Sequence, residues 1–212
     1  MTEADWNATD RPEVLLEWVV EEAVPPPSER QMQLFSIACC ERLLPVHPHP
    51  AYLHALQLMA NHIEGKRDEQ AVERLTDDLT GIEDAIDRIT TFAMALRMPW
   101  YDRETSGIAL RRLLLNTMLF RGAEEPLRLC SILRDVFGNP FHPVDFDPRW
   151  RSSTVLGLAT TINAERRYER MPILADALMD AGCDDEMLLS HCQGANEHVK
   201  GCWAIELLLA IP

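Results

Sequence analysis

The chain has 212 residues, of which 47% are hydrophobic and 25% are charged, and its formal net charge is −14. This length is enough to bury a sizeable core, so we expect a single domain over residues 1–212. Binding to nucleic acid or to anionic membranes depends on Lys and Arg, and the acidic balance therefore disfavours both. The sequence has no secretory leader pattern and no apolar run of membrane-spanning length. We therefore expect a cytoplasmic protein whose partner is another protein.

The N-terminal part has the hydrophobic period of helices, interrupted by prolines. Thr2 is expected to cap a short first helix and Asp10 the next one, while Ser28 and Gln31 have the spacing of a capping box. Further helices are predicted over about 51–63, 68–79 and 82–96, around Leu110–Leu119, and around Leu127–Phe137. Together they are expected to form an N-terminal bundle that ends near residue 137.

The stretch from Gly138 to Arg149 is irregular, because its three prolines exclude a helix or a central strand. It also carries Phe141, Val144 and Phe146, and so many large apolar side chains in a loop indicate that the loop is pinned to a core. We interpret it as a structural strap that precedes the C-terminal unit at about 138–212. An aromatic-lined groove for a ligand or a peptide is the alternative.

The C-terminal unit is expected to be a compact set of short helices. A helix from Met171 should end at Gly182 in a left-handed cap, and Asp184 should cap the next helix. The final run, Cys202–Ile211, has a single charge and is predicted to be buried on nearly all sides. The predicted fold class is all-α, as an irregular multi-helix bundle, with a helical-repeat arrangement as the alternative.

Three segments carry a family resemblance: Leu133–Trp150, Met171–Cys183 and His191–Trp203. They resemble a family of uncharacterised bacterial proteins that have an FGNPF-type loop, an LADALxxAGC helix end and a GPGPHVRGCW-type finish. The resemblance covers about Leu133–Ala210 and implies no activity. It also implies that an apolar residue is tolerated at the position of Cys192, which argues against an essential thiol there.

A candidate metal site lies in the C-terminal signature, where Cys183, Cys192, His198 and Cys202 have the spacing C-x8-C-x5-H-x3-C, with His191 as a spare ligand. Cysteine and histidine are the ligands that zinc prefers, but the tight C-x2-C pair of many zinc sites is missing. We therefore expect the structural interpretation, in which Cys183 and Cys202 fill the core and His198 binds a backbone carbonyl to hold its loop. Zinc bound by these residues is the alternative.

Two other groups of residues carry weaker patterns. One group is His142 in the irregular loop, with Asp145, Asp147 and Asp135 near it in sequence. A histidine oriented by a carboxylate can serve in acid–base catalysis, but no nucleophile accompanies it in this pattern. The other group consists of histidines around the prolines near residue 48, a weak metal-binding pattern: His47, His49, His54 and His62.

The sequence has no phosphate-binding loop, dinucleotide fingerprint, H-E-x-x-H or G-x-S-x-G pattern. The favoured hypothesis is a non-catalytic protein-interaction or structural module that needs no cofactor. The first alternative is a small zinc protein that uses the C-terminal Cys/His cluster. The second is an enzyme with a His/Asp site at the irregular loop.

Overall fold

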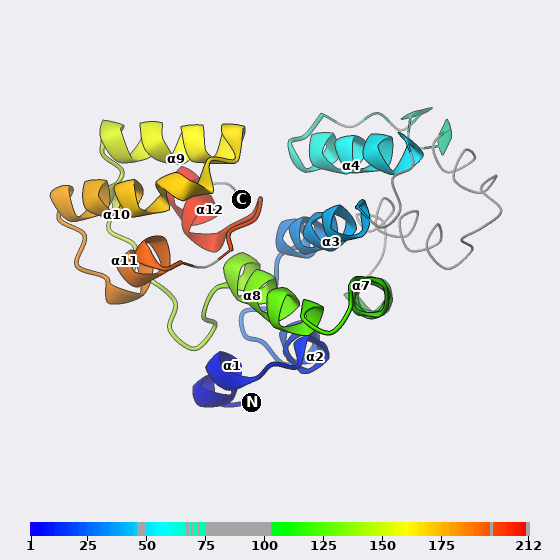
Figure 1. Ribbon diagram of the computed structural model, residues 1–212. Helices are drawn as coiled ribbons and strands as arrows, with labels where there is room; N and C mark the ends of the chain where they lie inside the picture. Colours follow the sequence, from blue (N-terminus) through cyan, green and yellow to red (C-terminus); the bar gives the residue numbers. More distant parts are fainter. Residues whose placement is uncertain are drawn as a thin grey trace. The chain divides into compact units, whose positions relative to one another are not determined.

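The computed structural model describes residues 1–45, 50–66, 68, 70, 71, 73, 74, 103–195 and 197–210 (Figure 1). All regular secondary structure within these residues is helical, which confirms the predicted all-α class. The chain divides into two compact units, Met1–Cys130 and Ser131–Pro212. The division falls inside a helix, not after it as the sequence suggested. The helices predicted over 68–79 and 82–96 lie wholly or largely outside the described residues.

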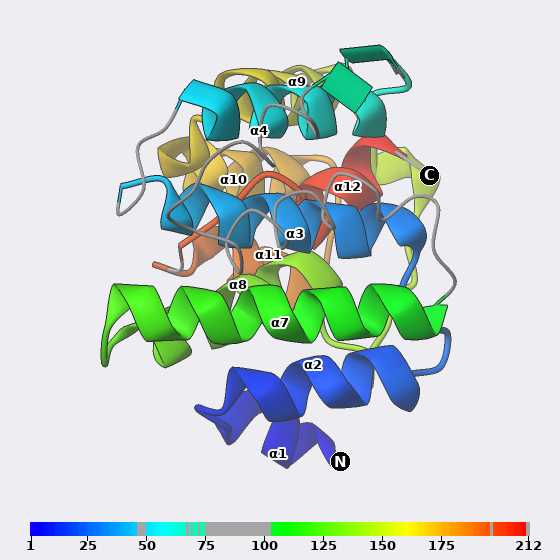
Figure 2. The same ribbon diagram turned by 90° about the vertical axis from the view of Figure 1, so that its right-hand side faces the viewer.

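Four helices of the N-terminal unit pack side by side in the order α2, α7, α3 and α4. Helix α7 packs against both α2 and α3, and α3 packs against α4, as Figure 2 shows. The bounds of the described helices in this unit are α1 Glu3–Ala8, α2 Pro12–Glu21, α3 Glu29–Leu43, α4 Pro50–Ile63, α7 Arg103–Arg121 and α8 Glu125–Phe137, the last of which continues into the C-terminal unit. The largest side chains that this packing buries are Trp6, Leu15, Leu16, Leu34, Phe35, Ile37, Leu43, Leu110 and Leu113.

The helix starts of this unit follow the predicted capping chemistry at two of three positions. Thr2 forms a capping box at the start of α1, and Ser28 forms one with Gln31 at the start of α3. The prediction for Asp10 was wrong, because Arg11 is the N-cap of α2 and makes no side-chain capping bond. Pro12 occupies the first turn of α2, where its missing N–H costs nothing.

The C-terminal unit builds its core from short helices around α12. Helix α9 packs against α10 and α12, and α11 packs against α10 and α12. The elements that follow α8 are η2 Pro148–Trp150, α9 Ser153–Glu165, η3 Tyr168–Arg170, α10 Met171–Asp180, α11 Glu186–Gln193 and α12 Trp203–Leu209. The fully buried apolar side chains of this core include Val155, Ile162, Leu174, Leu178, Leu188, Ile205 and Leu208.

The helix boundaries near the end of the chain agree with the sequence in part. Gly182 has φ +84°, as the predicted left-handed cap requires. Asp185, and not Asp184, caps α11. The expectation that the final run is buried holds in part, because every residue over 202–209 is buried or half-buried whereas Ala210 is exposed; Ile211 lies outside the described residues.

The irregular stretch from Gly138 packs onto the core of the C-terminal unit. Val144 and Phe146 lie against that core. The Phe146 ring meets Trp150 edge-on at 5.5 Å between centroids, and the Arg151 guanidinium lies over the Phe146 ring, 4.4 Å from its centroid. Arg151 also donates hydrogen bonds to two carbonyls at the end of α12, those of Leu207 and Leu208. These contacts favour the strap interpretation over a groove.

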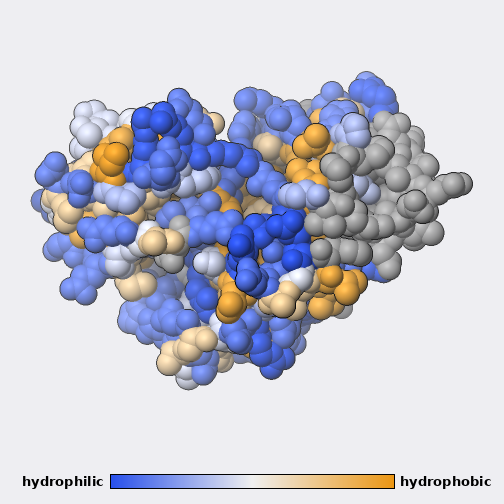
Figure 3. All heavy atoms as spheres, in the orientation of Figure 1, coloured by the Kyte–Doolittle hydropathy of each residue, from blue (hydrophilic) through white to orange (hydrophobic). Residues whose placement is uncertain are grey.

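Among the described residues, no helix combines the length and the apolar character needed to span a membrane. Hydrophobic residues on the face shown in Figure 3 form separate groups among hydrophilic ones.

Candidate metal centre

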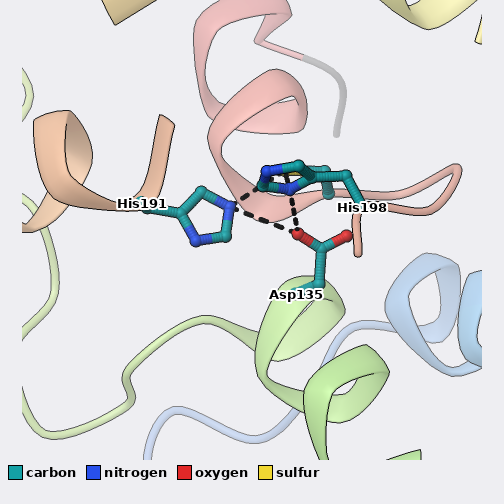
Figure 4. A group of neighbouring side chains, drawn as sticks. Asp135, His191 and His198 are labelled. Atoms are coloured by element: carbon teal, nitrogen blue, oxygen red, sulfur yellow. Dashed lines mark hydrogen bonds and ion pairs between the residues drawn. The ribbon is translucent and has the colours of Figure 1, made fainter. Parts of the chain in front are cut away.

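Four side chains with metal-binding atoms converge inside the C-terminal unit. They are Asp135, His191, His198 and Cys202, and one atom of each lies within 4.8 Å of one atom of every other. Asp135 and Cys202 are fully buried, and the His191 and His198 side chains are only 13% and 3% exposed. Figure 4 shows both imidazole rings directed toward the Asp135 carboxylate. The group is therefore a cluster of inward-facing polar atoms within an otherwise apolar core.

Each member comes from a different part of the unit. Asp135 lies on α8, and His191 lies on α11, whose start is fixed by the Asp185 cap. His198 lies in the loop between α11 and α12, and Cys202 is the N-cap residue of α12. All four parts must therefore fold together before the cluster exists.

The spacing H-x3-C does not place its two residues on one helical turn. Instead, Cys202 N donates to the carbonyl of Val199 at 3.0 Å, which closes a tight turn between them. Gly201 within this turn has φ +98°, a conformation that residues with a Cβ rarely adopt. The turn brings the Cys202 sulfur within 3.7 Å of Nδ1 of His198.

The shortest contacts of the cluster all involve Asp135 or His191. Oδ1 of Asp135 lies 2.7 Å from Nδ1 of His198 and 3.2 Å from Nε2 of His191. Nε2 of His191 lies 3.1 Å from the sulfur of Cys202. The two imidazole rings are edge-on to each other, with centroids 4.9 Å apart.

Asp135 is held as a carboxylate although it is buried. Burial alone raises its pKa, but hydrogen bonds from His191 and His198, together with the electrostatic attraction of the two rings, outweigh burial and lower the pKa below its ordinary value. The backbone N–H of Val199 donates to Oδ2 at 2.9 Å. A buried carboxylate with this many donors is satisfied, and it fixes the loop that carries His198.

Cys202 is a neutral thiol in this environment. Burial raises its pKa well above the ordinary value, and the charge of Asp135 raises it further. In a Cys–His–Asp triad, the carboxylate and the thiol bind opposite nitrogens of one imidazole. Here both approach the same nitrogen, Nε2 of His191, and they also share Nδ1 of His198. The arrangement is a poor match for nucleophilic catalysis, whereas four ligand atoms around one point suit a metal ion.

The outer nitrogens of the two histidines have different surroundings. Nδ1 of His191 accepts a hydrogen bond from Nε1 of Trp203 at 3.2 Å. Nε2 of His198 is buried and has no hydrogen-bond partner within the described part of the chain. The sequence predicted that His198 binds a backbone carbonyl; its partner is instead the Asp135 carboxylate.

The structure brings together two of the four ligands predicted from the sequence, His198 and Cys202. It adds His191, the predicted spare. Cys183 and Cys192 lie outside the group, in the apolar core of the C-terminal unit. Burial and the charges of Cys183 and Asp135 raise the pKa of Cys192 to about 12, so this thiol is neutral as well.

The other candidate residues are placed elsewhere. His142 and Asp145 are exposed, and Asp147 caps η2 while it accepts a hydrogen bond of 2.8 Å from Arg149. Of the histidines around residue 48, His54 is exposed and His62 is half-buried; His47 and His49 lie outside the described residues.

Asp135 is the member that the metal hypothesis from sequence did not include. It lies 63 residues before His198, so no local spacing connects the two. One signal was present: Asp135 borders the apolar face of its helix, three residues after the buried Ile132. An acidic residue at such a position indicates a buried partner.

Comparison of the sequence with protein-family models, with curated proteins and with solved structures finds no match. The resemblance to the family with the FGNPF-type loop therefore stays a prediction, and the function has to be argued from the site.

Proposed function

We propose that the protein binds one zinc ion through Asp135, His191, His198 and Cys202, and that the ion stabilises a non-catalytic structural module. The observation that carries this proposal is the convergence of four different ligand atoms within 4.8 Å of one another in a buried site. Carboxylate oxygen, imidazole nitrogen and thiolate sulfur are all established zinc ligands.

Three of the separations between ligand atoms are close to what a tetrahedral ion needs, and all of them lie within 4.8 Å. Metal–ligand distances of about 2.0–2.3 Å place ligand atoms about 3.3–3.6 Å apart. The measured separations from His191 Nε2 to Asp135 Oδ1 and to Cys202 Sγ are 3.2 and 3.1 Å, and Cys202 Sγ lies 3.7 Å from His198 Nδ1. The 2.7 Å contact between His198 and Asp135 is a hydrogen bond, and it has to lengthen by roughly 0.6 Å when the ion replaces the proton.

The charges of the ligand set also suit a divalent cation. The Asp135 carboxylate is already ionised, and the ion converts the Cys202 thiol to a thiolate by supplying the positive charge that its surroundings lack. Two anionic ligands and two neutral imidazoles then balance a charge of +2. Without the ion the same four ligand atoms form the hydrogen-bonded clasp, so the site also has a metal-free form.

A structural role is favoured over catalysis because four protein ligands fill a tetrahedral shell. Catalytic zinc sites keep one position for water or substrate. The ligands come from α8, α11, the following loop and α12, so an ion at their centre would tie these segments together. The free energy of binding would then contribute directly to folding of the C-terminal unit.

The test is the zinc content of tag-free protein, measured by elemental analysis after excess zinc has been supplied and removed by dialysis. We expect one equivalent per chain. Cys202→Ala and His191→Ala should abolish this binding, whereas the matched variants Cys183→Ala and Cys192→Ala, which alter buried thiols outside the cluster, should retain it. Circular dichroism is used to check that each variant is folded.

Zinc well below one equivalent in the wild-type protein would overturn the proposal. Loss of zinc in Cys183→Ala or Cys192→Ala, with retention in His191→Ala, would instead favour the ligand set expected from sequence spacing.

A further inference from the structure

The contact between Trp203 and His191 bears on which nitrogen of the imidazole carries its proton. The indole nitrogen is a donor only, so its 3.2 Å contact with Nδ1 of His191 requires a lone pair on Nδ1. The two rings lie close, with centroids 4.8 Å apart at an interplanar angle of 47°. A neutral imidazole carries one proton, and that proton must therefore be on Nε2.

The proton on Nε2 points into the cluster. Nε2 of His191 is 3.2 Å from the Asp135 carboxylate and 3.1 Å from the Cys202 sulfur, and both are acceptors. In this form His191 is a hydrogen-bond donor to the cluster. It has no lone pair to offer to a metal ion at the cluster centre.

Metal binding at Nε2 needs the opposite tautomer, with the proton on Nδ1. Two N–H groups, those of His191 and Trp203, would then face each other across 3.2 Å. His198 has no such constraint, because its outer nitrogen has no partner in the part of the chain that the structure describes. Its Nδ1 can therefore change from a donor to a ligand without losing another bond.

We infer that Trp203 is a positioning residue that holds the site in its metal-free form, and that metal binding requires the indole N–H to leave His191. This inference rests on the proposed zinc site. The Trp203 ring also lies against Gly138, where an added Cβ would meet ring atoms at 3.3–3.6 Å. Movement of the indole on metal binding would therefore change the contact of Trp203 with Gly138, the first residue of the irregular strap.

Trp203→Phe tests the inference because it keeps an aromatic ring and removes the N–H. Zinc affinity of the chelator-treated protein is measured by competition with a chromogenic chelator. We expect Trp203→Phe to bind zinc about 2- to 13-fold more tightly than the wild type, the equivalent of roughly 0.5–1.5 kcal/mol for one neutral hydrogen bond. The matched control is Trp150→Phe, in the same unit but in contact with Phe146, and it should leave the affinity unchanged. Equal or weaker binding by Trp203→Phe would contradict the inference.

A second measurement separates this inference from the zinc proposal. Nitrogen NMR of the imidazole rings in zinc-free protein should find His191 as the Nε2–H tautomer in the wild type, and this preference should be lost in Trp203→Phe. An Nδ1–H tautomer in the wild type would overturn the role of Trp203 even if zinc binds. Failure of both the wild type and Trp203→Phe to bind zinc would overturn the zinc proposal, and with it the coupling, whatever the tautomer.

Discussion

Replacing Asp135 by alanine should destabilise the C-terminal unit even without metal. The carboxylate accepts hydrogen bonds from the Val199 N–H at 2.9 Å, from His198 at 2.7 Å and from His191 at 3.2 Å. Its removal leaves buried donors without an acceptor, each worth about 1–3 kcal/mol, and breaking a buried charged network costs about 3–5 kcal/mol. We expect a loss of about 3–5 kcal/mol, which is large against a total stability of about 5–15 kcal/mol.

The assay is urea unfolding of protein that contains 5-fluorotryptophan, followed by fluorine NMR with a chelator present. The signals of Trp150 and Trp203 report on the C-terminal unit, whereas Trp6 and Trp18 report on the N-terminal unit. The matched control is Asp145→Ala, at an exposed position, which should change the free energy of unfolding by less than about 0.5 kcal/mol.

The reasoning would be refuted if Asp135→Ala unfolded within about 0.5 kcal/mol of the wild type in the Trp150 and Trp203 signals. Asp135→Asn adds a finer test. One amide oxygen can keep one or two of the bonds, but the amide NH₂ meets a donor, so the loss should be smaller, about 1–3 kcal/mol.

Three further predictions concern the packing around the site. Ile205→Ala, at a buried position on α12, should lower the free energy of unfolding in urea by about 2–5 kcal/mol. The control Ile173→Ala, at a position 53% exposed on α10, should lower it by less than about 1 kcal/mol, and equal losses would contradict the described core. Gly138→Ala should lower the free energy of unfolding more than Gly182→Ala does in the same assay. Both glycines have a positive φ, but only Gly138 faces a neighbouring ring, that of Trp203, and the reverse order would show that this contact is wrong. None of the six cysteines should react with a thiol reagent within minutes at pH 8 in the native protein, because all are buried and burial raises the pKa of Cys192, for example, to about 12. All six should react in denaturant, and rapid labelling of the native protein would contradict their burial.

The fold could be predicted from the sequence where local chemistry decides it. The Ser28 capping box and the left-handed Gly182 follow from residues three or four positions apart, and both are present. The start of α2 could not be predicted equally well, because Asp10 was expected as the cap and the structure uses Arg11, directly before Pro12 in the first turn.

The candidate site was predictable in half of its members, for a physical reason. His198 and Cys202 are close in sequence, and a turn through Gly201 brings them together. Cys183 and Cys192 were included because thiols are good zinc ligands, but both pack in the apolar core outside the cluster. Asp135 depends on the tertiary placement of α8 against the loop after α11, and no spacing rule contains that information.

X-ray absorption at the zinc edge of the zinc-loaded protein tests the central claim most directly, because it counts the sulfur ligands. The cluster of Asp135, His191, His198 and Cys202 predicts one sulfur at about 2.3 Å and three nitrogen or oxygen atoms at about 2.0–2.2 Å. Three sulfurs would contradict it and point to Cys183, Cys192 and Cys202, and a shell of nitrogen and oxygen alone would exclude Cys202 as a ligand.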